Sequence, residues 1–106
     1  MKYKLASSTW DHKEIGAIHK VIEGDVYSMG QEVASYEQEF AEYFGSTYAV
    51  MTSSGSTANL LMIASLFFTK NPALRLQRGD EIIVPAVSWS TTYFPLQQYG
   101  LHVKFV

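Results

Sequence analysis

Apolar residues recur every three or four positions in two segments of the first half of the chain, the pattern of helices with one buried face. The first helix follows Asp11, which has the spacing of a capping box with Glu14, and it ends at Gly24. A polar loop over residues 24–31 separates it from a second helix that ends at Gly45. The residues with helical spacing are Ile15, Ile18, Val21 and Ile22, then Val33, Tyr36, Phe40 and either Tyr43 or Phe44.

The second half of the chain alternates apolar runs with helical patterns. Three runs predict buried strands, at residues 48–51, 81–84 and 103–106. Helical spacing begins again at Ser56 or Thr57, and residues 88–99 predict another helix, in which Pro95 marks either a kink or the true start. The side chains expected to face inward from the earlier of these helices are Leu60, Ile63, Ala64, Phe67 and Phe68.

This order of strands and helices predicts an α/β architecture with a mainly parallel sheet. Three strands bury both faces of such a sheet poorly, and the last strand stops with the sequence. We therefore expect the sheet to be incomplete.

Composition narrows the function classes. The 106 residues are 47% hydrophobic and 17% charged, as in an ordered globular protein, and the net charge of −2 gives no reason to expect a nucleic-acid or membrane-surface partner. No cysteine is present, which excludes disulfides and thiolate metal sites and suits a cytoplasmic protein. His12, His19 and His102 lack metal-ligand spacing, and Glu37, Glu39 and Glu42 are expected to form a solvated helix face.

The segment MTSSGSTANLL, residues 51–61, places small hydroxyl residues and Gly55 where an apolar run becomes a helix. A helix N-terminus offers unpaired N–H groups and a partial positive charge to a phosphate. Gly55 allows close approach, and Ser54, Ser56 and Thr57 add hydroxyl donors. The segment is neither a Walker A loop nor a GxGxxG motif. From composition alone, a capped helix with no ligand is the alternative.

A second candidate is Trp89 in PAVSWSTT, directly after the second strand. Open α/β sheets bind ligands at the carboxyl ends of their strands, and an indole there can stack on a flat ring. The alternative is a core tryptophan that covers the end of the sheet. Together the two segments suggest a planar ring that carries a phosphate.

Both segments, SSGSTANLL and then GDEIIVPAVSWSTTYFPLQQYGLHVKFV, resemble the start of the DegT, DnrJ, EryC1 and StrS family of sugar aminotransferases. The resemblance implies a pyridoxal-phosphate (PLP) enzyme of the aspartate aminotransferase fold (PLP fold type I), an incomplete three-layer sandwich. Residues 1–106 would be an N-terminal fragment of the PLP-binding large domain, with a helical N-terminal segment at 1–45 and the start of the α/β sheet at 46–106. The strand at residues 48–51 would then lack its native neighbour.

The resemblance also implies roles for particular residues. Gly55 and Ser56 would bind the phosphate of PLP or pyridoxamine phosphate, and Trp89 would stack on its pyridine ring. The loop formed by Asp25, Val26, Tyr27 and Ser28, otherwise a plain connector, would approach a nucleotide sugar, across the interface of a homodimer. No catalytic residue is assigned, because the lysine of the transaminases, or the histidine that replaces it in dehydratases, would lie beyond Val106.

Within the family, these segments resemble a branch of enzymes that remove the C3 hydroxyl of a GDP-linked 4-keto-6-deoxy sugar. The resemblance implies glutamate as amino donor and a place on the route to lipopolysaccharide O-antigen. A sugar aminotransferase of the same fold is one alternative. A non-enzymatic phosphate-binding α/β domain is another.

Overall fold

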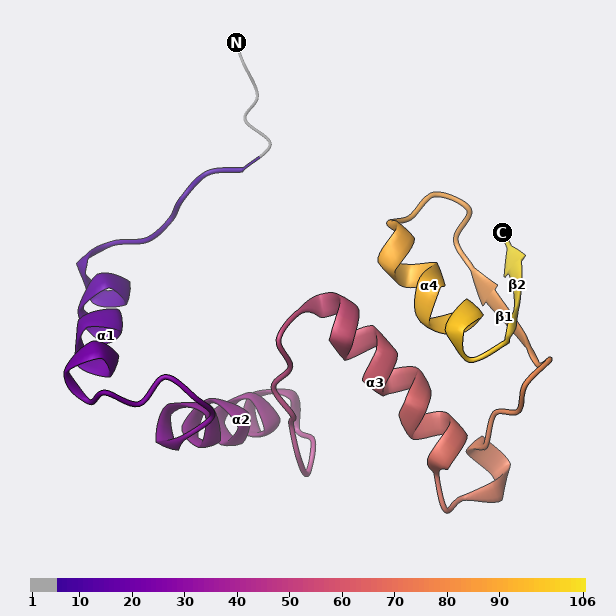
Figure 1. Cartoon of the computed structure of the whole chain (residues 1–106), viewed down its shortest axis with the longest axis horizontal. Helices are drawn as coiled ribbons and strands as arrows, with labels where there is room; N and C mark the ends of the chain where they lie inside the picture. Colours follow the sequence, from indigo (N-terminus) through magenta and orange to yellow (C-terminus); the bar gives the residue numbers. More distant parts are fainter. Residues whose placement is uncertain (1–5) are drawn as a thin grey trace, which may run out of the picture. The chain divides into compact units, whose positions relative to one another are not determined.

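The computed structural model describes residues 6–106, so residues 1–5 of the predicted N-terminal segment lie outside it. The chain divides into two compact units, Met1–Ala49 and Val50–Val106. The elements are α1 (His12–Glu23), α2 (Gln31–Phe44), α3 (Gly55–Phe68), the short 3-10 helix η1 (Pro72–Leu74), β1 (Glu81–Val84), α4 (Ser90–Gln98) and β2 (His102–Phe105) (Figure 1). None of the described helices is long and apolar enough to cross a bilayer.

Capping interactions between residues close in sequence determine where α1 begins and where both helices of the first unit end. The Asp11 carboxylate accepts the Lys13 N–H at 2.7 Å, and the Glu14 carboxylate accepts the Asp11 N–H at 2.8 Å. The backbone hydrogen bond from Asp11 lowers the pKa of Glu14, because it favours the charged form. Gly24 caps α1, and Gly45 caps α2 in the left-handed region at φ 66°. The predicted capping box and both helix ends are confirmed.

The apolar faces of these two helices are largely uncovered in the described chain. Ala41 is the one buried residue that α1 and α2 contribute. Along α2 the rings of Tyr36, Phe40 and Phe44 stack in series, with centroids 5.5 and 4.6 Å apart. The sequence pattern predicts these apolar faces correctly. Within residues 6–49 they remain exposed, at Ile15, Ile18, Ile22, Tyr36, Phe40 and Phe44.

The segment at residues 48–51 is not a strand, so that sequence prediction is wrong for this chain. Tyr48 and Val50 are 84% and 68% exposed. A strand forms only when a neighbouring strand satisfies its N–H and C=O groups, and no strand of the described residues pairs with this segment.

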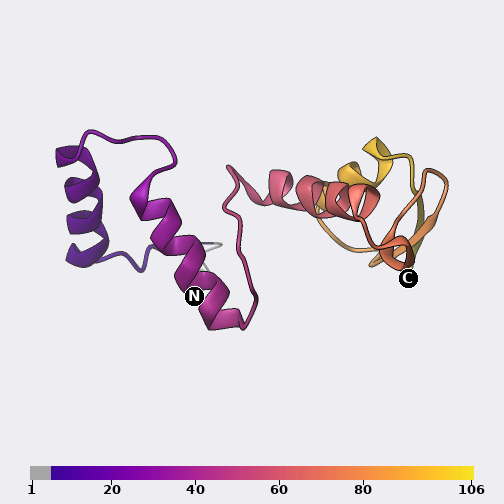
Figure 2. The same ribbon diagram turned by 90° about the horizontal axis from the view of Figure 1, so that it is seen from below.

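The second unit is a βαβ arrangement with one further helix. β1 and β2 pair in parallel, with Glu81 opposite His102 and Val84 opposite Phe105, and α4 connects them. α3 packs on α4, as Figure 2 also shows. Buried residues of the core are Val84, Leu96 and Leu101, with Ile63, Phe67, Leu76, Ile82, Tyr93 and Val103 packed against them.

The predicted α/β class with a parallel sheet is confirmed, and the described part of the chain has two strands in place of the three expected. Ile63 and Phe67 face the core as expected, whereas Phe68 is 78% exposed and its predicted inward position is wrong. Phe68 is the last residue of α3 and lies beyond the core that the two strands and α4 form.

Pro95 lies inside α4, which begins at Ser90, so the alternative that Pro95 starts this helix is wrong. Proline has no N–H and cannot donate to the carbonyl four residues earlier, that of Thr91. The Asn59 side-chain amide of α3 donates to this Thr91 carbonyl at 3.2 Å. A side chain from the neighbouring helix thus supplies a donor that the helix itself lacks.

With only four apolar side chains buried among residues 6–106, we expect the isolated 106-residue chain to bind the dye ANS and to unfold over a broad temperature range. Circular dichroism against temperature, with ANS fluorescence in parallel, measures both. A sharp cooperative transition in a dilute monomeric sample would contradict this prediction.

Candidate functional site

The N-terminus of α3 is built by a capping box. Ser54 is the N-cap, and its hydroxyl accepts the Thr57 N–H at 3.2 Å. In return the Thr57 hydroxyl accepts the Ser54 N–H at 3.0 Å and donates to the Ser54 carbonyl at 2.8 Å. Both hydroxyls are engaged within the cap, so the segment is a capped helix N-terminus.

The capping box leaves several hydrogen-bond donors at the start of α3 without an acceptor. Within the described part of the chain, the N–H groups of Gly55 and Ser56 and the Ser56 hydroxyl have no hydrogen-bond acceptor. No acidic residue lies in the first turn, and a Cβ added at Gly55 would meet no atom within 4 Å. Unpaired donors, open space and the positive end of the helix dipole together fit an oxyanion such as a phosphate.

α3 and α4 run in the same direction. Asn59 contacts Thr91 near their N-termini, and Phe67 contacts Tyr99 further along, with ring centroids 4.9 Å apart. Each contact joins residues 32 positions apart, which requires parallel helices. Both N-termini therefore lie at one end of the unit, and a cavity of about 200 Å³ there is lined from α3 by Ser56, Thr57 and Leu60, and from α4 by Thr91, Phe94, Pro95 and Gln98.

Trp89 is the N-cap residue of α4, and its side chain is 76% exposed. The alternative of a core tryptophan is therefore wrong within this chain. The turn that carries Trp89 is held by the Tyr93 hydroxyl, which donates to the Pro85 carbonyl at 2.8 Å, and by the Thr92 N–H, which donates to the Trp89 carbonyl at 2.9 Å. An exposed indole on a fixed turn can stack on a planar ring.

The loop of Asp25, Val26, Tyr27 and Ser28 belongs to the first unit. Asp25 has φ 51°, and the Tyr27 hydroxyl donates to the Ile22 carbonyl at 3.3 Å. Val26, Tyr27 and Ser28 line a hollow of about 510 Å³ between the end of α1 and the start of α2, while Asp25 does not. The loop is thus an exposed wall of a hollow. In the other unit, Gly55, Ser56 and Trp89 lie at the N-terminal ends of α3 and α4, and of these three residues only Ser56 lines the cavity there.

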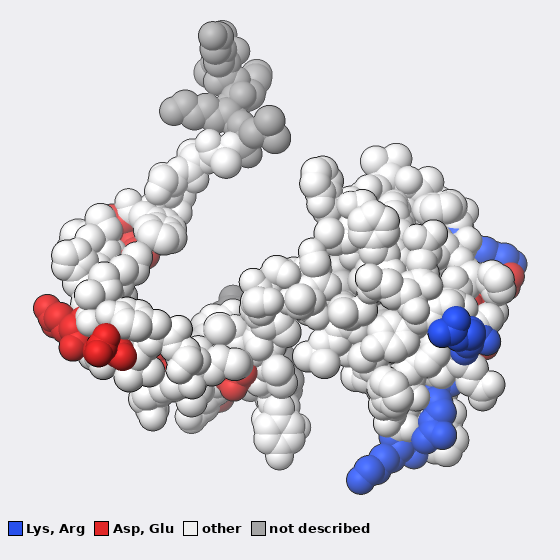
Figure 3. All heavy atoms as spheres, in the orientation of Figure 1, with Lys and Arg blue, Asp and Glu red and all other residues white. Residues whose placement is uncertain are grey.

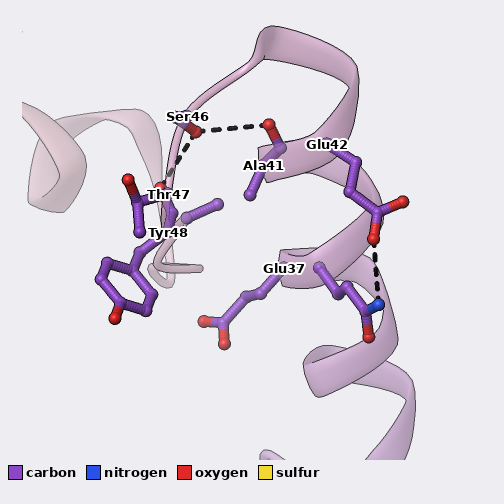
Figure 4. A pocket seen from close by; sticks show the side chains of 8 residues that line it. Glu37, Ala41, Glu42, Ser46, Thr47 and Tyr48 are labelled. Atoms are coloured by element: carbon purple, nitrogen blue, oxygen red, sulfur yellow. Dashed lines mark hydrogen bonds between the residues drawn. The ribbon is translucent and has the colours of Figure 1, made fainter.

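A further pocket, of about 330 Å³, lies between the end of α2 and the following segment (Figure 4). The Ser46 hydroxyl donates to the Tyr48 carbonyl at 3.1 Å, and the Gln38 amide donates to the Glu42 carboxylate at 3.0 Å. Glu37, which the sequence placed on a solvated face, is half-buried and also lines this pocket. Two carboxylates at its wall do not suit a phosphate.

Charge distinguishes the two units. No aspartate or glutamate occurs between residues 43 and 79. On the face shown in Figure 3, the Lys and Arg side chains gather over the second unit. The basic residues of that unit are Lys70, Arg75, Arg78 and Lys104. Lys70 and Arg75 follow the C-terminal end of α3, Arg78 lies against Gly100 after α4, and Lys104 pairs with Glu81 at 2.8 Å, so these charges do not lie at the helix N-termini. Among residues 6–106, no group of three His, Cys, Asp or Glu side chains could hold a metal ion.

Asn59 and Tyr93 are the site residues that sequence analysis missed. Pro95 was the available signal for Asn59, because a proline inside a helix frees a carbonyl that needs another donor. The partner's identity depends on which helix packs alongside.

Comparison with known proteins finds relatives that are similar along the whole chain. The chain is 67% identical over 106 residues to GDP-4-keto-6-deoxy-D-mannose 3-dehydratase of Yersinia pseudotuberculosis, covering all of this chain and 26% of that protein. It is 68% identical over the same length to the enzyme of that name from Escherichia coli O55:H7, covering 27% of it. The chain thus spans about a quarter of the length of these relatives.

Solved structures of 3-dehydratases also match this chain. The E. coli 3-dehydratase with bound hydrated PLP matches with a TM-score of 0.90 at 68% identity, over 99% of this chain and 26% of that chain. A 3-dehydratase with a trapped PLP–glutamate geminal diamine matches equally well, over 99% and 27%. A variant of that enzyme with bound GDP-perosamine has a TM-score of 0.89 at 68% identity, over the same shares.

The predicted aminotransferase-type α/β fold is therefore confirmed for the matched region. The profile of the DegT/DnrJ/EryC1/StrS aminotransferase family matches residues 8–106, nearly the whole chain. The chain belongs to the DegT/DnrJ/EryC1/StrS aminotransferase family.

Proposed function

We propose that this chain is the N-terminal part of a PLP-dependent nucleotide-sugar 3-dehydratase that acts on GDP-4-keto-6-deoxymannose. The observation that carries the proposal is 67–68% identity, along all 106 residues, to two enzymes of that name. In this proposal, residues 1–45 form the helical N-terminal segment and residues 46–106 the start of the sheet of the PLP-binding large domain.

The second unit supplies the groups that a pyridine ring with a phosphate needs. The free N–H groups of Gly55 and Ser56, with the Ser56 hydroxyl, would bind the phosphate, and Trp89 would stack on the ring. Bound PLP or pyridoxamine phosphate supplies the electron sink that makes loss of the C3 hydroxyl possible. The chain's own residues anchor and orient it.

The remaining partners follow from the same relatives. The substrates would be the nucleotide sugar and glutamate, since solved relatives hold GDP-perosamine and a PLP–glutamate adduct. The loop of Asp25, Val26, Tyr27 and Ser28 would approach the nucleotide sugar, and the exposed apolar faces of α1 and α2 would be covered in a homodimer. The enzyme would be a cytoplasmic lyase that contributes to lipopolysaccharide O-antigen synthesis.

Gly55→Ala tests the phosphate site in the full-length protein. The added methyl meets nothing in this chain, so the free energy of unfolding should change by less than about 1 kcal/mol. It would occupy space needed by the phosphate and weaken PLP binding by roughly 10-fold or more. Titration with PLP and with pyridoxal, which lacks the phosphate, separates the effects. Equal losses for both ligands would contradict a phosphate site.

Trp89→Ala tests the ring contact. Because the indole is mostly exposed, the melting temperature should stay nearly unchanged, while PLP and pyridoxal should both bind roughly 3- to 10-fold more weakly. Trp89→Phe should recover most of the affinity. If Trp89→Ala bound both ligands as tightly as the parent protein, the stacking role would be wrong.

The reaction itself decides between dehydratase and aminotransferase. We expect the full-length protein, given GDP-4-keto-6-deoxymannose, glutamate and PLP, to release the 3-deoxy sugar nucleotide. Mass spectrometry distinguishes this product from the 4-amino sugar that a transaminase would form. If the amino sugar were the sole product, the protein would be an aminotransferase and not a dehydratase. If neither product formed and no cofactor bound, the non-enzymatic alternative would stand.

A further inference from the structure

We propose that Asn59 is a positioning residue that holds α4, and with it Trp89, in a fixed place relative to the phosphate-binding turn of α3. The inference rests on the proposed function. It concerns a residue that contacts neither phosphate nor ring, and it acts through one hydrogen bond.

The bond has a specific cause. Pro95 cannot donate to the Thr91 carbonyl, so α4 lacks a hydrogen bond in the middle of its length. Asn59 donates its Nδ2–H to that carbonyl at 3.2 Å, and Asn59 is itself half-buried. A carbonyl in a helix–helix contact that loses its donor is destabilised, because water reaches it poorly.

The bond also lies in the right place. Asn59 follows Gly55 by four residues, one turn of α3, and Thr91 follows Trp89 by two residues. It therefore joins the turn that would hold the phosphate to the turn that would hold the ring. The aromatic contact of Phe67 with Tyr99 near the far end of the helices, and the apolar packing of Ile63 and Phe67 on the core cluster that includes Leu96, are not directional and permit sliding along the axis. The directional hydrogen bond of Asn59 fixes the axial position.

The Tyr93 hydroxyl does not replace this function. It ties α4 back to the Pro85 carbonyl and so fixes the turn that carries Trp89 to the end of β1. Its hydrogen bonds are to the Pro85 and Ala86 carbonyls, neither of which belongs to α3. Only the Asn59 bond relates Trp89 to Gly55 and Ser56 through a polar contact among the described residues.

The test uses Asn59→Leu in the full-length protein with PLP. Leucine keeps the volume and removes the donor, so α4 would sample other positions and the site would be assembled for a smaller fraction of the time. We expect PLP affinity to fall roughly 5- to 10-fold, and the circular dichroism of bound PLP to change even at saturation. A purely structural role would lower the melting temperature and leave the signal of the saturated protein unchanged.

Pro95→Ala provides the matched background. It restores an N–H four residues after Thr91, so the helix can satisfy that carbonyl alone. Because this intrahelical bond does not link α4 to α3, Asn59→Leu in this background should still weaken PLP binding roughly 5- to 10-fold and change the bound-cofactor signal, at a smaller cost in stability. The double variant also allows the test if Asn59→Leu alone fails to fold, because Pro95→Ala lets α4 satisfy the Thr91 carbonyl itself.

Asn71→Leu is the control. Asn71 also makes one side-chain hydrogen bond in this unit, accepting the Ala73 N–H at 3.1 Å, but at η1. It should lower stability without changing PLP affinity. Unchanged PLP affinity and signal in Asn59→Leu, or a loss that Pro95→Ala abolishes, would overturn the inference while leaving the proposed function intact. Failure of the parent protein to bind PLP would overturn both.

Discussion

The parallel packing of α3 on α4 is the constraint on which the candidate site depends. Each helix begins with unpaired donors and the positive end of its dipole, and a shared direction brings both beginnings to the end of the unit where β1 finishes. An antiparallel pair would place Trp89 at the opposite end from Gly55. The site is therefore a consequence of helix direction more than of any single side chain.

The βαβ topology explains why the helices take that direction. β1 and β2 are parallel, so α4 must run back along the sheet, with its N-terminus above the carboxyl end of β1. α3 packs against α4 through Asn59 and Phe67, in the one register that satisfies the carbonyl that Pro95 leaves open. A proline that weakens a helix in isolation thereby gives the pair a defined axial position.

The small core limits what this chain does alone. Val84, Leu96 and Leu101 are the buried centre of the second unit, and the first unit buries Ala41. Large apolar faces remain exposed on α1 and α2, a distribution that is typical of surfaces completed by other protein surfaces. The residues of the candidate site, in contrast, are positioned by local caps and one helix pair.

The sequence by itself determined the features that depend on neighbours within a few residues. The Asp11–Glu14 capping box, the stops at Gly24 and Gly45, and the hydroxyl-rich start of α3 all follow from contacts over three or four positions. Tertiary structure decided the rest. Residues 48–51 lack a partner strand, Trp89 is exposed, and Asn59 meets Thr91 across 32 positions. Strand pairing, burial and contacts between helices depend on residues that are distant in the chain, and no local pattern specifies which of them will meet.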